Sequence, residues 1–163
     1  MRKLAFFAPL AAAVAFAGIA AAQPASVNVT LSHALEREAQ TLGEREVQEQ
    51  VDRLTWVLQS RLADTAALDG ARIELVLTDL KPNRPTMEQI AKRPGLDPIR
   101  SRSIGGAAIE GTVILADGST HEVSYDWFSS NLADVRGHGT WTDADRAYSR
   151  LARNLATGRY EVR

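Results

Sequence analysis

One feature constrains the fold of this chain more than any other: an apolar stripe at helical spacing between residues 47 and 62. Its members recur every three or four positions, and the positions between them are mostly polar. This spacing is typical of an amphipathic helix, which needs another layer to cover its apolar side. A second stripe of the same kind begins after Thr142 and stops before Gly158. The two stripes consist of Val47, Val51, Leu54, Leu58 and Leu62, and of Ala144, Ala147, Tyr148, Leu151 and Leu155.

The covering layer is predicted by segments in which apolar and polar residues alternate, the pattern of a half-buried strand. Residues 27–31 and 72–80 show it, and two further segments flank Asp117-Gly118 as a hairpin. A two-residue turn there would put the apolar residues of the two hairpin strands on opposite sides of the sheet. A three-residue loop, 116–118, puts them on one side, with Gly118 in the left-handed conformation that glycine adopts without strain. We therefore expect the three-residue loop.

The resulting order of elements is β-α-β-β-β-α, which predicts an α+β fold. We expect a two-layer sandwich in which a mostly antiparallel sheet carries two amphipathic helices on one face. Residues 23–163 are predicted to form this single domain. A long irregular loop at 81–103, rich in proline, interrupts it. Loops of this length are usually functional or mobile, and the sequence leaves both readings open.

Three positions carry helix-capping signals. Thr41 and Glu44 have the spacing of a capping box and are expected to begin the long helix, while it stays open whether residues 33–40 are helical. Thr86 is expected to cap a short helical turn inside the irregular loop. Thr142 is expected to cap the last helix.

The first residues of the chain predict its compartment. A basic tip, Met1-Arg2-Lys3, leads into an apolar stretch at 4–19 and then into small residues before Gln23. This layout is typical of a secretory signal peptide, here residues 1–22, cleaved between Ala22 and Gln23. We expect the mature protein to be periplasmic or secreted, with an uncleaved N-terminal anchor as the alternative.

Composition excludes several classes of function. The chain carries 19 basic and 20 acidic residues, so no basic excess points to nucleic acid as a partner. It contains no cysteine, which excludes disulfides, thiol nucleophiles and thiolate metal sites. No apolar run after the leader reaches the ~20 residues that a membrane-spanning helix needs. Its three histidines lie far apart and no nucleotide-binding or hydrolase motif occurs, so neither a metal nor a cofactor is expected.

Several short motifs carry a resemblance to a known group of proteins. These are the run at 75–80 (LVLTDL), the strand end Tyr125-Asp126-Trp127, and Trp141 leading into Asp143. Together with the order of elements, they resemble small exported proteobacterial proteins of a domain-of-unknown-function family. The resemblance implies an envelope location and an α+β fold, and it implies no activity. The segment 81–86 departs from that pattern.

Candidate binding residues lie in the irregular loop. It holds six basic residues against two acidic ones in an otherwise slightly acidic chain. Guanidinium groups on a loop stiffened by proline can hold a carboxylate or phosphate through paired N–H donors. Arg84, Arg100 and Arg102 are the predicted binding residues. The alternative is a solvated surface loop.

Trp56 is a further candidate because helical spacing puts it opposite the apolar stripe, among polar neighbours. A tryptophan on a polar helix face is often the anchor of a protein contact. The alternatives are cover by the long loop or the N-terminal segment, and simple exposure.

Carboxylates on the polar face of the hairpin offer a catalytic alternative. Glu110, Glu122 and Asp126 are expected to share that face, and two close carboxylates can act as an acid and base pair. A small hydrolase that uses Glu110 and Asp126 is therefore one hypothesis, and solubilising surface charge is the simpler reading.

Three functions follow from these observations. We expect an exported soluble envelope protein that binds an envelope protein or an anionic ligand without catalysis. The alternatives are the small hydrolase and a purely structural or stress-related periplasmic protein. Oligomeric state is not encoded in any of these patterns.

Overall fold

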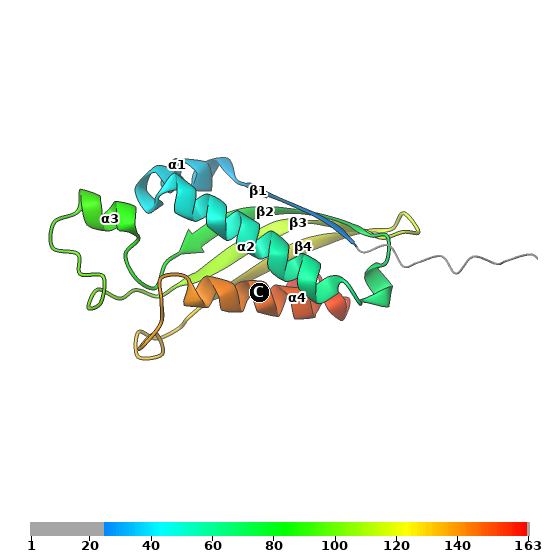
Figure 1. Cartoon of the computed structure of the whole chain (residues 1–163). Coiled ribbons are helices and arrows are strands. Elements are labelled where there is room, and N and C mark those ends of the chain that lie inside the picture. Colours follow the sequence, from blue (N-terminus) through cyan, green and yellow to red (C-terminus); the bar gives the residue numbers. More distant parts are fainter. Residues whose placement is uncertain (1–24, 163) are drawn as a thin grey trace, which may run out of the picture.

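The computed structural model describes residues 25–162, in which a five-stranded sheet carries its long helices on one face (Figure 1). The predicted signal peptide lies outside the described residues. The strands are β1 (Ser26–Leu31), β2 (Arg72–Lys81), β3 (Gly106–Ile114), β4 (Thr120–Phe128) and β5 (Glu161–Val162). The helices are α1 (His33–Leu42), α2 (Glu44–Leu62), α3 (Met87–Lys92) and α4 (Thr142–Ala156), with a short 3₁₀ turn at Ala66–Leu68.

The strands follow one another across the sheet in chain order, from β1 at one edge to β5 at the other. The long pairs β2–β3 and β3–β4 are antiparallel, whereas β1 and β5 each pair with their neighbour in parallel. A parallel pair needs a crossover, and α2 supplies it between β1 and β2. The predicted α+β sandwich with two amphipathic helices on one face is confirmed, while the sheet is mixed and β5 was not in the predicted order β-α-β-β-β-α.

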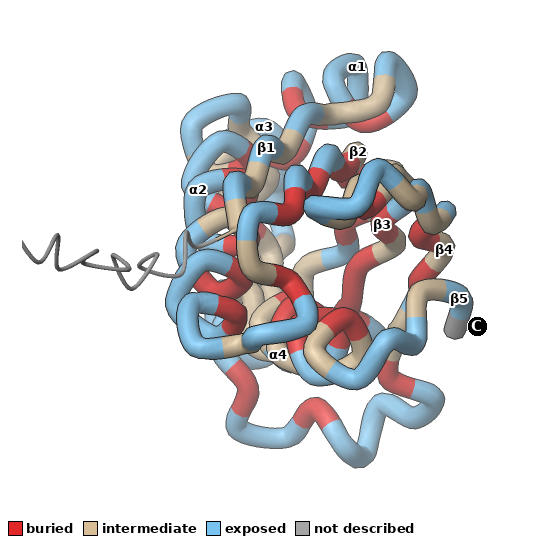
Figure 2. The backbone as a smooth tube through the Cα atoms, turned by 90° about the vertical axis from the view of Figure 1, so that its right-hand side faces the viewer, coloured by how far each residue is buried: buried red, intermediate tan, exposed pale blue. Residues whose placement is uncertain are grey.

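The core lies between α2, α4 and the facing side of the sheet, where Figure 2 shows the buried residues gathered. Leu54 of α2 and Leu151 of α4 are almost completely buried, as are Ile73, Leu77 and Ile109 of the sheet. Every member of both predicted stripes is buried. The stripes are therefore the faces that the two layers bury against each other.

The hairpin has the predicted loop. Leu115 N donates to Ser119 O at 2.8 Å, which closes the hairpin around residues 116–118. Gly118 has a φ of 86°, in the left-handed region that other residues enter only with strain. Burial of the apolar strand face has set the register, as the pattern predicted.

Two predicted caps are wrong. Gly43, with a φ of 102°, turns the chain between two separate helices, so Thr41 lies in the last turn of α1 and cannot cap α2. Residues 33–40 are thus helical, within α1. Thr142 is the first residue of α4 and not its cap, because the chain enters this helix through Trp141. The Thr142 hydroxyl instead accepts a hydrogen bond from Gly139 N at 2.9 Å.

The irregular loop contains one regular piece, α3. Thr86 and Gln89 form a capping box there: Gln89 N donates to Thr86 Oγ1 at 3.2 Å, and Thr86 N donates to Gln89 Oε1 at 3.1 Å. The predicted Thr86 cap is confirmed.

The two ends of the sheet differ. The segments 82–105 and 129–141 both lie at the end of the sheet that carries α3, which we call the loop end (Figure 1). The hairpin loop lies at the other end. Within residues 25–162, no helix combines the length and apolarity needed to cross a membrane.

Candidate functional site

A buried polar cluster around Asp143 holds the loop end together. Asp143 lies in the first turn of α4 and is completely buried. Its carboxylate accepts hydrogen bonds from Asn83 Nδ2 at 2.6 Å, from Ser129 Oγ, and from Arg146 Nη1 at 3.0 Å. The Asp143 backbone N–H in turn donates to Asn83 Oδ1 at 2.9 Å. Segments about 60 residues apart in the chain are thereby joined at one carboxylate.

The charge of Asp143 is stabilised by these partners. Burial raises the pKa of the Asp143 carboxyl, but hydrogen bonds from Ser129 and Asn83 outweigh it, helped by the charges of His138 and Arg146. The net result is a pKa below the usual value of 3.8. Asp143 is therefore an ionised, fully hydrogen-bonded group that supports structure.

The cluster resembles a catalytic triad only in composition. His138 is buried, with Nδ1 3.4 Å from Asp143 Oδ1. The Ser129 hydroxyl donates to the carboxylate and not to the imidazole, so no base is placed to activate it as a nucleophile. Sequence reasoning missed this cluster because Asn83 lies 60 residues before Asp143 and no local pattern joins the two.

Arg84, one of the predicted binding residues, faces the protein. Its Nε donates to the carbonyl of His138 and its Nη1 to the carbonyl of Ile99. These bonds tie segment 82–105 to segment 129–141. Arg84 therefore supports the two loops, and its guanidinium is not free to take a ligand as the sequence predicted.

A groove of about 280 Å³, here called the loop-end groove, opens between α3 and the chain that follows it. Arg93 and Arg102 stand on its wall, and both are exposed. Within residues 25–162, neither guanidinium forms a hydrogen bond or an ion pair. Two unpaired cations thus border one depression. The other residues that line it are Lys81, Pro82, Pro85, Gln89, Leu96, Ser101, Ser103 and Ile104.

The remaining predicted cations play different parts. Lys81 is already paired, with Nζ 3.0 Å from Asp79 Oδ2 and 4.8 Å from the centre of the Phe128 ring. Arg100 is exposed but does not line the groove. Its backbone N–H, with that of Ile99, donates to Asp97 Oδ1 and lowers the pKa of that carboxyl.

Of the predicted arginines, only Arg102 lies at the groove, and the sequence prediction missed Arg93 as its partner. The signal for Arg93 was its place directly after the short helix that Thr86 caps. A residue that ends α3 is held by the same capped turn that forms one wall of the groove.

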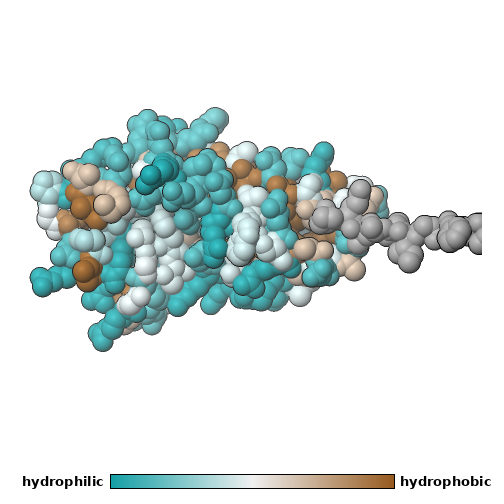
Figure 3. All heavy atoms as spheres, viewed as in Figure 1, coloured by the Kyte–Doolittle hydropathy of each residue, from teal (hydrophilic) through white to brown (hydrophobic). Residues whose placement is uncertain are grey.

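Large apolar side chains are exposed around the same end of the molecule. Met87 is 70% exposed, Ile99 76% and Ile104 39%. Figure 3 shows hydrophobic atoms at the surface of the end that carries α3. An apolar surface beside unpaired cations is the composition expected of a ligand-binding surface.

Trp56 lies on α2, away from the loop end, and is 57% exposed. No described segment folds over it, so the predicted cover is absent from residues 25–162. The Arg53 guanidinium lies 4.8 Å from the Trp56 ring centre and also pairs with Asp145 of α4 at 2.8 Å. Trp56 thus contributes to a small surface contact between α2 and α4.

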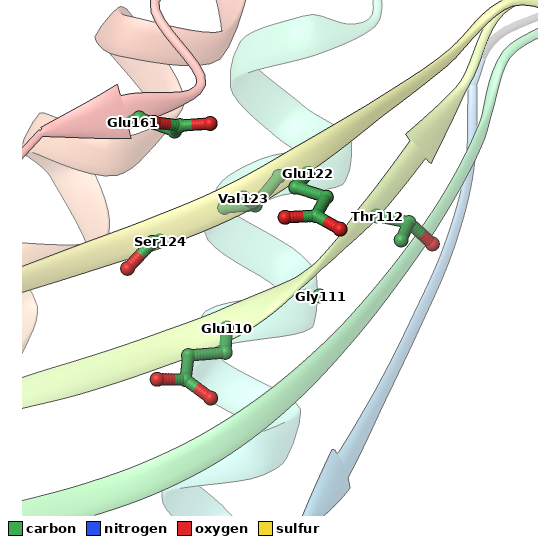
Figure 4. A pocket seen from close by; sticks show the side chains of 7 residues that line it. All are labelled: Glu110, Gly111, Thr112, Glu122, Val123, Ser124 and Glu161. Carbon is green, nitrogen blue, oxygen red and sulfur yellow. The ribbon is translucent and has the colours of Figure 1, made fainter.

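The helix-free face of the sheet carries the carboxylates of the hydrolase alternative. Glu110, Glu122 and Glu161 project from this face around an open depression (Figure 4). Glu110 and Asp126 are both exposed to solvent. The hydrolase alternative requires a partly dry site around these two carboxylates, and their exposure to solvent argues against such a site. Within residues 25–162, no group of three or more potential ligands is placed to hold a metal ion.

No family model matches the chain, and a search of curated proteins found no relative. The resemblance to exported proteins of a domain-of-unknown-function family therefore stays a prediction from short motifs.

Proposed function

We propose that this protein is an exported, non-catalytic binding protein that takes an anionic ligand with an apolar part at the loop-end groove. The observation that carries the proposal is the pair of unpaired guanidinium groups, Arg93 and Arg102, beside one partly apolar groove. Arginine binds carboxylates and phosphates through paired N–H donors, and such bonds are stronger than those between neutral groups.

The apolar part of the ligand is inferred from the floor of the groove. Pro82, Pro85 and Leu96 line it, and Ile104 extends it toward the surface. Burying an alkyl group against these side chains contributes about 0.8 kcal/mol per methylene. A purely inorganic anion would leave this surface wet.

The supporting structure makes the groove rigid. Arg84 and the Asp143 cluster fix the chain on both sides of α3, so the two cations are held in place before a ligand arrives. A binding site that is formed in advance loses less conformational entropy when it is filled. The buried cluster has this supporting role in the proposal, and the exposed carboxylates have none.

Short anionic amphiphiles test the proposal. Octanoate and octyl phosphate are the probes, and octyl glucoside is the neutral control, all below their micellar concentrations and followed by isothermal titration calorimetry. We expect an anionic probe to bind and the R93S/R102S variant to bind it about tenfold more weakly, because two exposed ion pairs contribute about 1 kcal/mol in sum or slightly more.

A matched control removes the same charge elsewhere. Arg37 and Arg61 are exposed and do not line the groove, so the R37S/R61S variant should bind like the wild type. Equal affinity of the wild type and R93S/R102S, or equal binding of the neutral amphiphile, would refute the proposed site.

A further inference from the structure

Strand β1 has an open edge. It pairs with β2 on one side only, and it is the first strand in the order of the sheet (Figure 1). Ser26 N donates to Ala71 O, and Ser32 N donates to Leu77 O, so the even-numbered residues direct their backbone groups toward β2. The N–H and C=O groups of Val27, Val29 and Leu31 therefore face outward. Within residues 25–162 no backbone group pairs with them.

This edge lacks the features that normally protect an exposed strand. Such strands are usually short, bulged, or interrupted by charged residues or proline. Residues 25–32 contain neither a charge nor a proline, and the pairing of β1 with β2 runs without a bulge. The opposite edge is different, because β5 has only two residues and includes Glu161.

The open edge is complementary to itself. In an antiparallel pair centred on Val29, Val27 would lie opposite Leu31 and Val29 opposite its own copy, all on the apolar side. On the polar side, Asn28 would lie opposite Thr30. Every apolar residue then meets an apolar one and every polar residue a polar one, with no like charges opposed.

We infer that β1 pairs antiparallel with β1 of a second copy of this chain, so that the two sheets become one continuous sheet in a two-fold symmetric dimer. The outward groups of Val27, Val29 and Leu31 form the backbone hydrogen bonds. With a two-fold axis through Val29, both subunits contribute the same surface to the contact, as an isologous interface requires.

The helix layer is compatible with this arrangement. Arg53 of α2 pairs with Asp145 of α4, so that flank of α2 faces α4. Helical spacing puts Gln48 and Thr55 on the opposite flank, on the β1 side. These side chains carry no charge, and α2 packs on β1. Asp52 lies next to them on the solvent side of this flank, where it accepts a hydrogen bond from Gln48 Nε2 at 3.0 Å.

Sedimentation velocity over a concentration series tests the dimer, with the full chain produced with its leader and recovered as the cell processes it. We expect a monomer–dimer equilibrium. In the N28K/T30K variant, each introduced lysine would oppose another across the axis, so the dissociation constant should rise about tenfold or more. Asn28 lies beside Glu74 in the register, so a lysine there should be tolerated within one subunit.

The matched control is T112K/T120K, which adds two lysines to the same face of the sheet away from β1. It should leave the dimer unchanged, and circular dichroism checks that both variants are folded. A wild type that stays monomeric at all concentrations, or an N28K/T30K variant that still dimerises as the wild type does, would overturn the inference.

Crosslinking tests the register. Because the chain has no cysteine, an introduced cysteine is its only thiol. A mixture of N28C and T30C proteins should form a disulfide between the two variants, since these positions face each other across the axis at a separation that a disulfide can span. Either variant alone should crosslink much less. Crosslinking of N28C alone as fast as the mixture, or pairing of β1 with a peptide of another protein in place of a second copy, would contradict the arrangement.

Discussion

Replacing Asp143 by asparagine tests whether the buried cluster holds the loop end together through charge. The substitution keeps the shape of the side chain but removes its charge, and it directs an amide N–H toward groups that already donate. Ser129, Asn83 and Arg146 all donate to this carboxylate, and the residue is completely buried. We expect D143N to lower the free energy of unfolding by about 2–4 kcal/mol, since buried donors lose a charged acceptor.

The effect should depend on pH with a defined sign. The folded pKa of Asp143 lies below its usual 3.8, so the folded state favours the ionised form. Its contribution to stability is complete above pH 3.8 and is lost as the pH falls through the folded pKa. The difference between wild type and D143N should therefore be constant near neutral pH and shrink in acid.

Urea unfolding followed by circular dichroism at several pH values measures both quantities. Asp145 provides the control, because it lies on the same turn of α4 but is partly exposed and pairs with Arg53 at the surface. D145N should lower the free energy of unfolding by about 1 kcal/mol or less. The reasoning fails if D143N lowers the free energy of unfolding no more than D145N does. It also fails if the difference in unfolding free energy between D143N and the wild type does not shrink in acid.

Four further measurements test other parts of the structure. Leu54→Ala should lower the free energy of unfolding by about 2–5 kcal/mol in a urea titration, because Leu54 is completely buried; a loss under about 1 kcal/mol would contradict its core position. Gly111→Ala should destabilise the sheet strongly, because the added Cβ would lie 2.1 Å from Glu74 O. The Cβ of Gly137→Ala would meet nothing within 4 Å, so this variant should lower the free energy of unfolding by only about 1–2 kcal/mol, because of its left-handed backbone. Equal shifts of the melting temperature in the two variants would refute this. Burial raises the pKa of Tyr125 to about 12. Between pH 10 and that value, the wild type should lose stability that Tyr125→Phe retains, because the unfolded state ionises first. Parallel curves of unfolding free energy against pH for the two proteins would contradict this. Mass spectrometry of periplasmic material should find a chain that begins at Gln23, and an intact leader would refute the predicted cleavage.

The parts of the fold that the sequence predicted are those set by local periodicity. The stripe at 47–62 and the alternation around the hairpin each follow from which face must be buried, so neither needs information from distant residues. The break at Gly43 was harder to predict, because both α1 and α2 are amphipathic and Thr41 and Glu44 have the spacing of a capping box across it.

The candidate site was predicted only in outline. The sequence shows a basic loop, but whether each arginine is free to bind a ligand depends on contacts between segments far apart in the chain. Arg84 meets the carbonyl of His138, 54 residues away, and nothing local to Arg84 signals that contact. Nothing local to Asp143 indicates burial, and it is the most deeply buried charge of the described chain.

The parallel pairing of β1 with β2 has a consequence for how the protein is made. Ser26 of β1 pairs with Arg72 of β2, so β1 is synthesised well before the strand with which it pairs. Both α1 and α2 have local hydrogen bonds and are complete in sequence before β2 is synthesised. Substitutions that weaken α2 should therefore slow formation of the whole sheet as well as lower the stability of the folded protein, because α2 is the crossover that brings β2 beside β1.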